Sequence, residues 1–167
     1  DVFAAIVPLA AARIVELGCG NAELTRALAT RHPDARITAF EVDRVQHAKN
    51  LAGSAPPNIT FAYGSADAIP LPDASCTVVL MAKSLHHVDV PAMDAALAEI
   101  ARVLEPGGYA AFSEPVYAGE FNALMSIFHD EQRVREAAFE ALRRAVANGG
   151  FELVAERFHT ALRRFAD

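Results

Sequence analysis

The sequence contains few cysteines, and this limits both its covalent chemistry and its surroundings. Only Cys19 and Cys76 are cysteines among 167 residues. They fall at opposite ends of two strands that we expect to be parallel neighbours, too far apart for a disulfide. Neither has His or Cys residues at the spacing of zinc ligands, so no zinc site is expected around them. Free thiols fit a reducing compartment, and the sequence predicts a cytoplasmic protein.

Long apolar segments and an excess of positive charge are also missing. The longest apolar run covers residues 2–12 and contains Pro8, whereas a helix that crosses a bilayer needs about 20 apolar residues. Only Asp1 precedes this run, so we expect neither a membrane span nor a secretory signal. Lys and Arg number 15 against 21 Asp and Glu, and this balance disfavours nucleic acid as a partner.

Apolar residues are abundant and regularly spaced. They make up 53% of the chain, enough for one domain over residues 1–167 with a sizeable core. Predicted strands cover residues 13–17, 36–41, 59–63, 76–81, 109–113 and 151–158. Segments with apolar residues three and four apart lie between them and predict helices that pack on a sheet. This alternation favours a doubly wound α/β fold with a mainly parallel sheet, with residues 1–116 as its core and residues 117–167 as a helical segment and final strand.

Several residues predict where the early helices begin and end. Asn21 is expected to cap the first helix, and Asp43 with Gln46 resembles a capping box for the second. The segment Pro106-Gly107-Gly108 is expected to end the helix that starts near Met93 and to turn the chain into the strand at 109–113.

A further helix is predicted between Asp130, as its cap, and residues 148–150. His129, Asp130 and Glu131 offer metal-binding side chains in a row. No metal site is expected there, because consecutive residues of a helix point in different directions.

A glycine loop, Gly18-Cys19-Gly20, follows the first predicted strand directly and precedes the first helix. In a doubly wound sheet this turn lies at the carboxyl end of the strand, where ligands bind. Glycine allows a ligand to approach the backbone and tolerates a positive φ. The loop is therefore a candidate ligand site.

Carboxylates around this loop indicate which ligand it suits. Glu16 precedes the glycines, and Glu23 stands where a dinucleotide fingerprint has its third glycine, so a pyrophosphate is disfavoured. Glu41 ends the next strand about 20 residues beyond the loop, where a carboxylate accepts hydrogen bonds from ribose hydroxyls. Asp43 already serves as a helix cap, so we assign the ribose to Glu41. Together these features favour adenosine without phosphates.

These motifs resemble the class I S-adenosylmethionine-dependent methyltransferases, in particular those that act on small molecules. The resemblance covers residues 1–116 and is carried by residues 14–22, Glu41, residues 64–73, Ser84-Leu-His-His-Val88 and Leu104-Glu-Pro-Gly-Gly108. It implies a Rossmann-like methyltransferase fold, S-adenosylmethionine as the cofactor, and methyl transfer to a small molecule.

The resemblance also implies which residues bind the cofactor. Gly18 and Gly20 would admit its methionine and sugar, Glu16 would face its amino group, and Glu41 would hold the ribose. The other implied contacts are Cys19, Val42, the adenine-bordering Ser65, Ala66 and Asp67, and the methionine-side Ala82 and Lys83. Two positions depart from the family pattern: Ala22 replaces a third glycine, and Ser65 replaces an Asp that receives the adenine amino group, which leaves Asp67 to take that contact.

His86 and Glu114 are the candidate catalytic residues. Adjacent histidines usually point in different directions, and we favour His86 over His87 as a substrate contact or general base, because a pKa near neutrality suits proton removal. Glu114 ends the fifth strand and would point into the same crevice. Each also fits a structural role, as a hydrogen-bonded histidine or as a surface carboxylate. No metal is expected.

Two other functions remain open, a nicotinamide-dependent oxidoreductase and a non-catalytic adenosyl-binding domain. Glu16 and Glu23 disfavour the first. The family normally finishes with two antiparallel strands, but only residues 151–158 predict one. Either the last strand lies outside this sequence or another chain supplies it, and an unpaired sheet edge predicts a homodimer.

Overall fold

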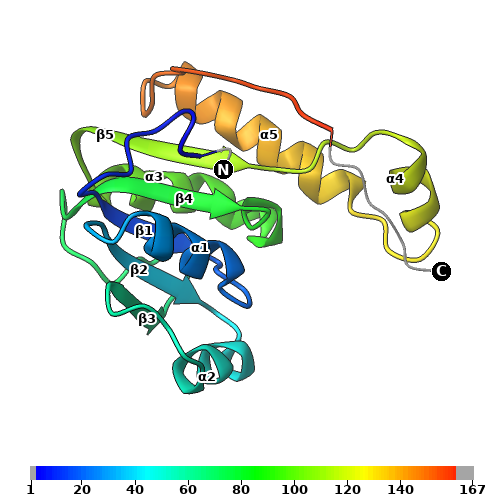
Figure 1. Cartoon of the computed structure of the whole chain (residues 1–167). Coiled ribbons are helices and arrows are strands. Elements are labelled where there is room, and N and C mark those ends of the chain that lie inside the picture. Colours follow the sequence, from blue (N-terminus) through cyan, green and yellow to red (C-terminus); the bar gives the residue numbers. More distant parts are fainter. Residues whose placement is uncertain (1–2, 161–167) are drawn as a thin grey trace.

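A five-stranded parallel sheet forms the centre of the computed structural model, which describes residues 3–160 (Figure 1). Its strands are β1 (Arg13–Leu17), β2 (Arg36–Glu41), β3 (Ile59–Tyr63), β4 (Cys76–Ala82) and β5 (Leu104–Ser113). Their order is β3-β2-β1-β4-β5, so the chain runs outward from β1 and then restarts on its other side with β4. This reversal confirms the predicted doubly wound topology and creates a switch point between β1 and β4, where such sheets bind ligands.

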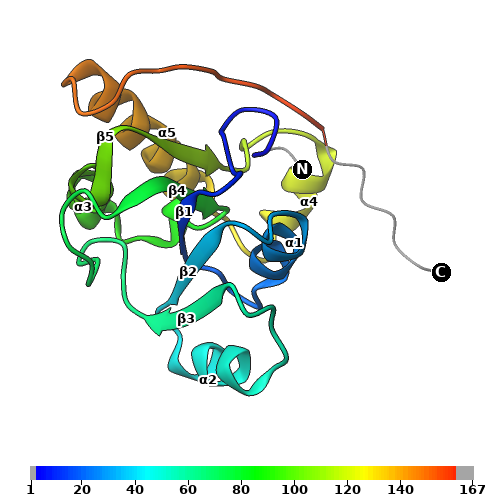
Figure 2. The same cartoon turned by 60° about the vertical axis from the view of Figure 1, so that its left-hand side comes forward.

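Helices cover both faces of this sheet, as Figure 2 shows. They are α1 (Glu23–Arg31), α2 (Arg44–Ala52), α3 (Met93–Val103) and α5 (Gln132–Ala147), with two short 3₁₀ helices, η1 (Leu85–His87) and η2 (Val90–Ala92). The short helix α4 (Glu120–Met125) lies away from the sheet, on an arm beyond β5 (Figure 1). Ile14 of β1 packs in a buried cluster with residues of α1, and the next residue, Val15, packs in a second cluster with α3 and α5. Neighbouring strand residues therefore serve opposite faces, as a sheet covered on both sides requires.

The predicted helix caps are partly confirmed. Asp43 Oδ1 accepts hydrogen bonds from the backbone N–H groups of Val45 (2.8 Å) and Gln46 (3.2 Å), which confirms Asp43 as the cap of α2. The first helix begins at Glu23, and its N-cap is Ala22 in the left-handed conformation rather than Asn21. The prediction for Asn21 was wrong by one position, although Asn21 Oδ1 accepts a bond from Glu23 N (3.3 Å).

The start of β5 differs from the prediction. The strand begins at Leu104, directly after α3, and Pro106-Gly107-Gly108 lies inside it instead of separating it from the helix. Cys76 of β4 pairs with Leu104, but Val78 pairs with Tyr109, so extra residues of β5 bulge out between them. Gly107 makes this possible, because its φ of 81° lies in the left-handed region.

The strand predicted at residues 151–158 was wrong, because the described residues 151–160 pair with no strand. Phe151 packs against the core, whereas Leu153, Val154 and Phe158 are 62%, 71% and 74% exposed. The segment runs as an extended trace along α5 (red in Figure 1). A groove of about 2120 Å³, lined by β5 and residues 150–160, accompanies it. Because residues 151–160 are not paired with a strand, their backbone groups do not form the inter-strand hydrogen bonds of a sheet.

Cys19 and Cys76 are free and buried, as expected from their positions on the sheet. Within residues 3–160, no helix has both the length and the apolar character of a membrane span.

Candidate functional site

The glycine loop is fixed to the neighbouring strand by its own backbone. The N–H groups of Gly18 and Cys19 both donate to the carbonyl of Phe40, at 3.0 Å each. Gly18 and Gly20 have φ angles of 69° and 54°. A Cβ atom on Gly18 would lie 2.7 Å from Ser84 Cβ, whereas one on Gly20 would meet no atom within 4 Å. Gly18 is therefore required for packing, and Gly20 leaves open space in which a ligand can approach the backbone.

Glu41 connects the end of β2 to this loop. Its carboxylate is buried and accepts three backbone hydrogen bonds, from Gly20 N at 2.7 Å and from Val42 N and Asp43 N at 2.9 Å each. A carboxylate has about four acceptor positions, so capacity remains for a hydroxyl donor. The structure places Glu41 beside the glycine loop, as the assignment to ribose requires.

Glu16 lies beneath the same loop, and only 2% of it is exposed. Burial raises the pKa of its carboxyl to about 7, although the Thr25 hydroxyl, which donates to Oε2 at 2.6 Å, partly opposes this shift. Burial and the charges of Glu16 and Glu41 together raise the pKa of the Cys19 thiol to about 12. The negative charges of Glu16 and Glu41 therefore both lie close enough to the glycine loop to raise the pKa of the same thiol, that of Cys19. A cation bound there would stabilise them in their charged form.

Asn50 of α2 also holds the glycine loop, and the sequence did not reveal it. Its buried side chain donates to the carbonyl of Gly20 at 2.7 Å and lies 3.6 Å from Cys19 Sγ. Ser84 plays a similar part from the other side, since its hydroxyl donates to the carbonyl of Leu17 at 2.8 Å. In the sequence, Asn50 does not differ from an ordinary polar residue of a helix, whereas Ser84 belongs to the segment Ser84-Leu-His-His-Val88 that carries the family resemblance.

The remaining predicted cofactor contacts lie at the same end of the sheet. Ser65 forms an isolated bridge with Ala68 after β3, beside the buried Ala66 and the exposed Asp67. Ala82 ends β4, and the backbone N–H of the following Lys83 donates to Ser113 at 2.7 Å. The predicted Val42, next to Glu41, is 53% exposed and offers an apolar surface at the end of β2.

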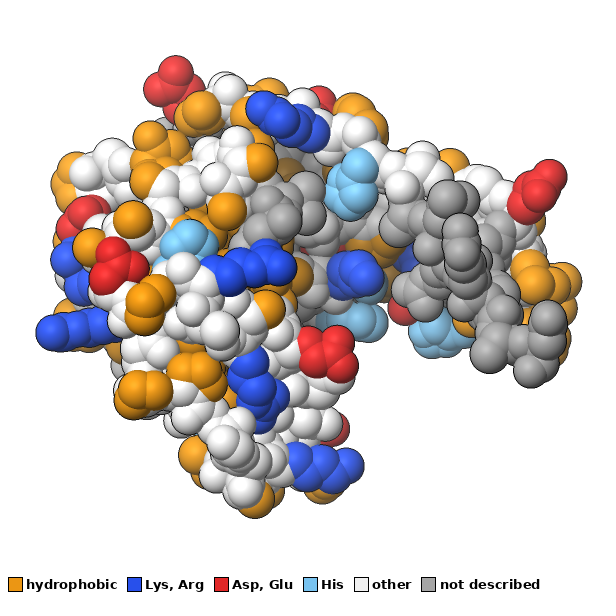
Figure 3. Space-filling view, in the orientation of Figure 1, with side chains coloured by type: hydrophobic (Ala, Val, Ile, Leu, Met, Phe, Trp, Pro, Cys, Tyr) orange, Lys and Arg blue, Asp and Glu red, His pale blue; other side chains and the backbone are white. Residues whose placement is uncertain are grey.

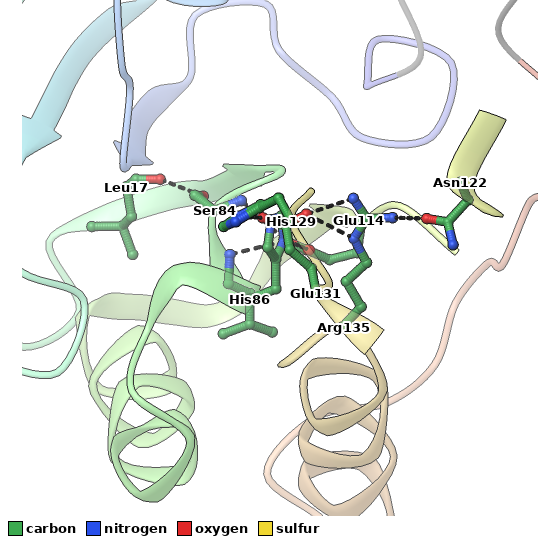
Figure 4. A network of polar contacts seen from close by, with 9 residues as sticks. Leu17, Ser84, His86, Glu114, Asn122, His129, Glu131 and Arg135 are labelled. Atoms are coloured by element: carbon green, nitrogen blue, oxygen red, sulfur yellow. Dashed lines mark hydrogen bonds and ion pairs between the residues drawn. The ribbon is translucent and has the colours of Figure 1, made fainter. Parts of the chain in front are cut away.

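His86 and Glu114, predicted separately, form a buried pair. Glu114 Oε2 contacts His86 Nδ1, and only 4% and 2% of the two side chains are exposed. Glu114 Oε1 accepts bonds from Ser84 N (3.1 Å) and Leu85 N (2.9 Å), which fixes the carboxylate against η1 (Figure 4). This arrangement orients the imidazole and leaves Nε2 as its other ring nitrogen for chemistry.

His87 is exposed whereas His86 is buried, as expected for adjacent histidines. The centres of the two rings lie only 4.1 Å apart. Partial burial, followed by the neighbouring His86, lowers the pKa of His87. The structure therefore presents one buried and one accessible imidazole as the last two residues of η1.

A second polar cluster reaches this region from α4 and α5. Glu131 Oε2 accepts from Arg135 at 2.6 Å, and Glu131 Oε1 lies 3.1 Å from His129 Nε2. Arg135 also donates to Asn122 Oδ1 at 2.7 Å, which joins α5 to α4. The N-cap of α5 is Glu131, so the prediction of Asp130 as the cap was wrong by one position, although Asp130 Oδ1 accepts from Gln132 N at 3.0 Å. The expectation that His129 and Glu131 diverge was wrong, because both precede the helix.

Figure 3 shows a hollow between the body of the molecule and the arm that carries α4, with histidine side chains at its wall. Acidic and basic groups also border it.

Residues 14–108 match the family model described as a methyltransferase domain. The chain belongs to this methyltransferase family. An uncharacterized methyltransferase of Mycobacterium tuberculosis is 39% identical over 103 residues, which cover 62% of this chain and 40% of that protein. The 27-O-demethylrifamycin SV methyltransferase of Amycolatopsis mediterranei is 34% identical over 141 residues, covering 81% of this chain and 50% of that protein. This methyltransferase chain therefore spans about half the length of these curated relatives.

A solved structure shows the same fold. The S-adenosylmethionine-dependent methyltransferase from Mesorhizobium loti has a TM-score of 0.59 and 24% identity, with 66% of this chain and 50% of that chain covered. The comparisons confirm the resemblance to class I S-adenosylmethionine-dependent methyltransferases and the Rossmann-like sheet. S-adenosylmethionine is the cofactor of this family, and the open face of Gly20 beside two buried carboxylates fits a cationic nucleoside.

Proposed function

We propose that this chain binds S-adenosylmethionine at the carboxyl ends of β1 and β2 and transfers its methyl group to a small molecule. The observation that carries the proposal is the carboxylate of Glu41, which is bonded to Gly20 N and adjoins a glycine with no atom near its missing Cβ. The acidic Glu16 beneath the loop suits a ligand that carries positive charge. An oxidoreductase is disfavoured by these same charges and by the family match.

The chain's own contribution to the reaction is binding and alignment. The bound cofactor supplies a methyl group that is already electrophilic, because it is attached to a positively charged sulfur. In this proposal Glu41 accepts hydrogen bonds from the ribose, Glu16 attracts the ammonium group, and Gly20 lets the cofactor approach the backbone. Holding the reacting atoms about 3 to 3.5 Å apart and excluding water can contribute roughly 7 to 11 kcal/mol.

His86 is the proposed acceptor of a proton from the substrate. Glu114 fixes its Nδ1 and would stabilise the imidazolium that forms when Nε2 takes the proton. A relative that is 34% identical is named for the methylation of 27-O-demethylrifamycin SV, and we propose a small molecule as the acceptor here as well.

Binding of the cofactor is tested by calorimetry with S-adenosylmethionine and its product S-adenosylhomocysteine. We expect Glu41→Gln to weaken binding at least about tenfold, equivalent to about 1.4 kcal/mol, because the amide offers the ribose and Gly20 N fewer acceptors. Glu23→Gln is the matched control, since Glu23 is exposed at the start of α1. If the intact chain binds neither compound, the proposal is wrong. Binding without transfer to any acceptor would identify an adenosyl-binding domain instead.

The proton-acceptor role of His86 is tested separately, by the pH dependence of kcat. We expect His86→Gln to lower kcat by roughly 10²- to 10⁴-fold and to change the pH profile of kcat, with little change in cofactor affinity. Glu114→Gln should shift the pH profile, because it alters the partner of Nδ1. An unchanged profile in both variants would restrict the pair to a structural role.

The proposal also covers the cellular location of the protein and its dimerisation. We propose a cytoplasmic location, supported by the two free, buried thiols. We also propose a homodimer through the outer edge of β5, supported by the lack of a strand paired to that edge within residues 3–160.

A further inference from the structure

Two polar networks converge beside the end of β4. The first runs from the Leu17 carbonyl through Ser84 and Glu114 to His86. The second, described above, links His129, Glu131, Arg135 and Asn122 at the start of α5. Figure 4 shows the two networks facing each other. Within the described part of the chain, no direct hydrogen bond joins Glu131 to His86 or His87, so a gap separates the networks.

The gap is lined by three metal-binding side chains. One potential ligand atom from each of His86, His87 and Glu131 lies within 4.8 Å of the others. His86 is buried, Glu131 is half-buried and His87 is exposed, so the cluster is rigid on one side and accessible on the other. Small rotations of the exposed His87 ring can bring its ligand atom closer to the other two, toward the separation of roughly 3.3 Å that bonds of about 2 Å to one tetrahedral ion require.

The donor set indicates which ions would suit the site. Two imidazoles and one carboxylate match divalent ions such as Zn²⁺, Co²⁺, Ni²⁺ and Fe²⁺. Mg²⁺ and Ca²⁺ prefer sites made only of oxygen atoms. The site is therefore expected to discriminate against these two ions.

Two of the three side chains already have the outer partners that orient metal ligands. Glu114 holds His86 Nδ1, which directs Nε2 away from the carboxylate. Arg135 holds Glu131 through two nitrogens, Nε at 3.1 Å and Nη2 at 2.6 Å. Hydrogen bonds of this kind to a ligating histidine or carboxylate fix its orientation and tune its affinity for the ion.

We propose that His86, His87 and Glu131 form a binding site for one divalent transition-metal ion, with Zn²⁺ as the best match. The ion would connect η1 to the start of α5. Three protein ligands leave one position of a tetrahedral ion open, and this position can take an oxygen or nitrogen atom of a small molecule. The sequence predicts no metal, because Glu131 lies more than 40 residues from His86 and His87 along the chain and only the fold brings the three together.

The site goes beyond the proposed methyl transfer and can be tested without the cofactor. It shares His86 Nε2 with the proposed proton acceptor, so the two uses exclude each other. An occupied site holds the imidazole as a ligand, whereas an empty one leaves it free to take a proton.

Calorimetry with Zn²⁺ alone, and the visible absorption of added Co²⁺, measure binding to the whole chain without S-adenosylmethionine. We expect one ion per chain with micromolar or tighter affinity. His87→Ala and Glu131→Gln should each weaken binding by roughly tenfold or more. Thermal unfolding of each variant without metal shows whether it is folded, and both positions are at least partly accessible.

His32→Asn is the matched control, because His32 follows α1 and lies outside the cluster. Its affinity for Zn²⁺ should equal that of the unchanged chain. The proposal is overturned by the absence of stoichiometric binding, by unchanged affinity in His87→Ala or Glu131→Gln, or by an equal loss in His32→Asn. None of these results depends on whether the chain methylates a substrate.

Discussion

At the scale of single residues, Gly20 and Gly107 form a natural comparison. Both have a positive φ, 54° and 81°, and a Cβ atom would meet nothing within 4 Å at either position. Alanine should therefore cost about 1 kcal/mol of stability in both places, because its Cβ disfavours this backbone conformation. Only Gly20 belongs to the proposed cofactor loop.

We expect Gly20→Ala to weaken S-adenosylmethionine binding by about tenfold or more, or about 1.4 kcal/mol, because the new methyl group occupies the approach to the backbone. Gly107→Ala should lose the same stability and keep its affinity. Thermal unfolding and calorimetry on both variants measure the two effects. Equal affinities would mean that the cofactor does not touch Gly20.

Glu16 makes stability depend on pH. Burial raises its pKa from 4.5 to about 7, so between these values the folded chain holds a proton that the unfolded chain releases. The free energy of unfolding contributed by this group therefore falls as pH rises through that window and levels off above pH 7. Glu16→Gln should remove this slope and stabilise the chain above neutrality by about 3 kcal/mol. Urea unfolding at several pH values is the measurement.

The raised pKa of Glu16 also predicts how cofactor binding depends on pH. A bound ammonium group favours charged Glu16, so affinity should rise with pH through about 7 in the unchanged chain and stay flat in Glu16→Gln. Parallel pH profiles for the two proteins would show that Glu16 does not face the cationic part of the ligand.

At the scale of elements, α3 holds the predicted adenine loop in place. Arg102 of α3 donates to the carbonyls of Ile69 and Leu71, at 2.9 Å each, and to Asp73 at 2.7 Å. Hydrogen bonds to Glu99 and Asp73 raise the pKa of Arg102. One side chain thus fixes the segment that connects β3 to β4.

We expect Arg102→Gln to release this loop. Amide hydrogens of residues 65–73 should exchange faster, and cofactor affinity should fall, because glutamine cannot reach both carbonyls and the carboxylates together. Arg143→Gln is the control, since Arg143 pairs with Glu140 on its own helix. Unchanged exchange in the loop would mean that Arg102 does not determine its order.

Element by element, local sequence signals explain what could be predicted. The bounds of β1, β2 and β3 follow from short runs rich in apolar and β-branched residues that end at glycine or polar residues. The start of β5 could not be predicted, because Pro106 and the following glycines signal a turn, whereas the pairing of Leu104 depends on Cys76 across the sheet. Residues 151–158 have the apolar pattern of a strand but no partner, which shows that the pattern is necessary and not sufficient.

The residues of the candidate site likewise fall into those that the sequence predicts and those that it does not. The glycine loop and Glu41 could be predicted, because their spacing along the chain determines where a doubly wound sheet places them. Asn50 beside Gly20, and the ligand atoms of His86 and Glu131 within 4.8 Å of each other, could not, because the fold brings them together from distant parts of the sequence.

At the scale of the whole molecule, β5 forms one of the two outer edges of the sheet. Within residues 3–160 the strand pairs only with β4, and the groove beside it is lined by Leu153 and Val154, both largely exposed. An unpaired edge next to exposed apolar side chains favours contact with a second copy of the chain. The proposed homodimer would cover both.

Sedimentation velocity over a range of concentrations tests this association. Leu153→Lys combined with Val154→Lys should weaken dimerisation at least about tenfold, because roughly 1.5 to 3 kcal/mol of apolar burial per side chain is lost. Leu51→Lys on α2 is the control, since Leu51 is similarly exposed (59%) and α2 packs near β3 at the other edge of the sheet. A chain that stays monomeric at every concentration would exclude the dimer, and an equal effect of Leu51→Lys would place the contact elsewhere.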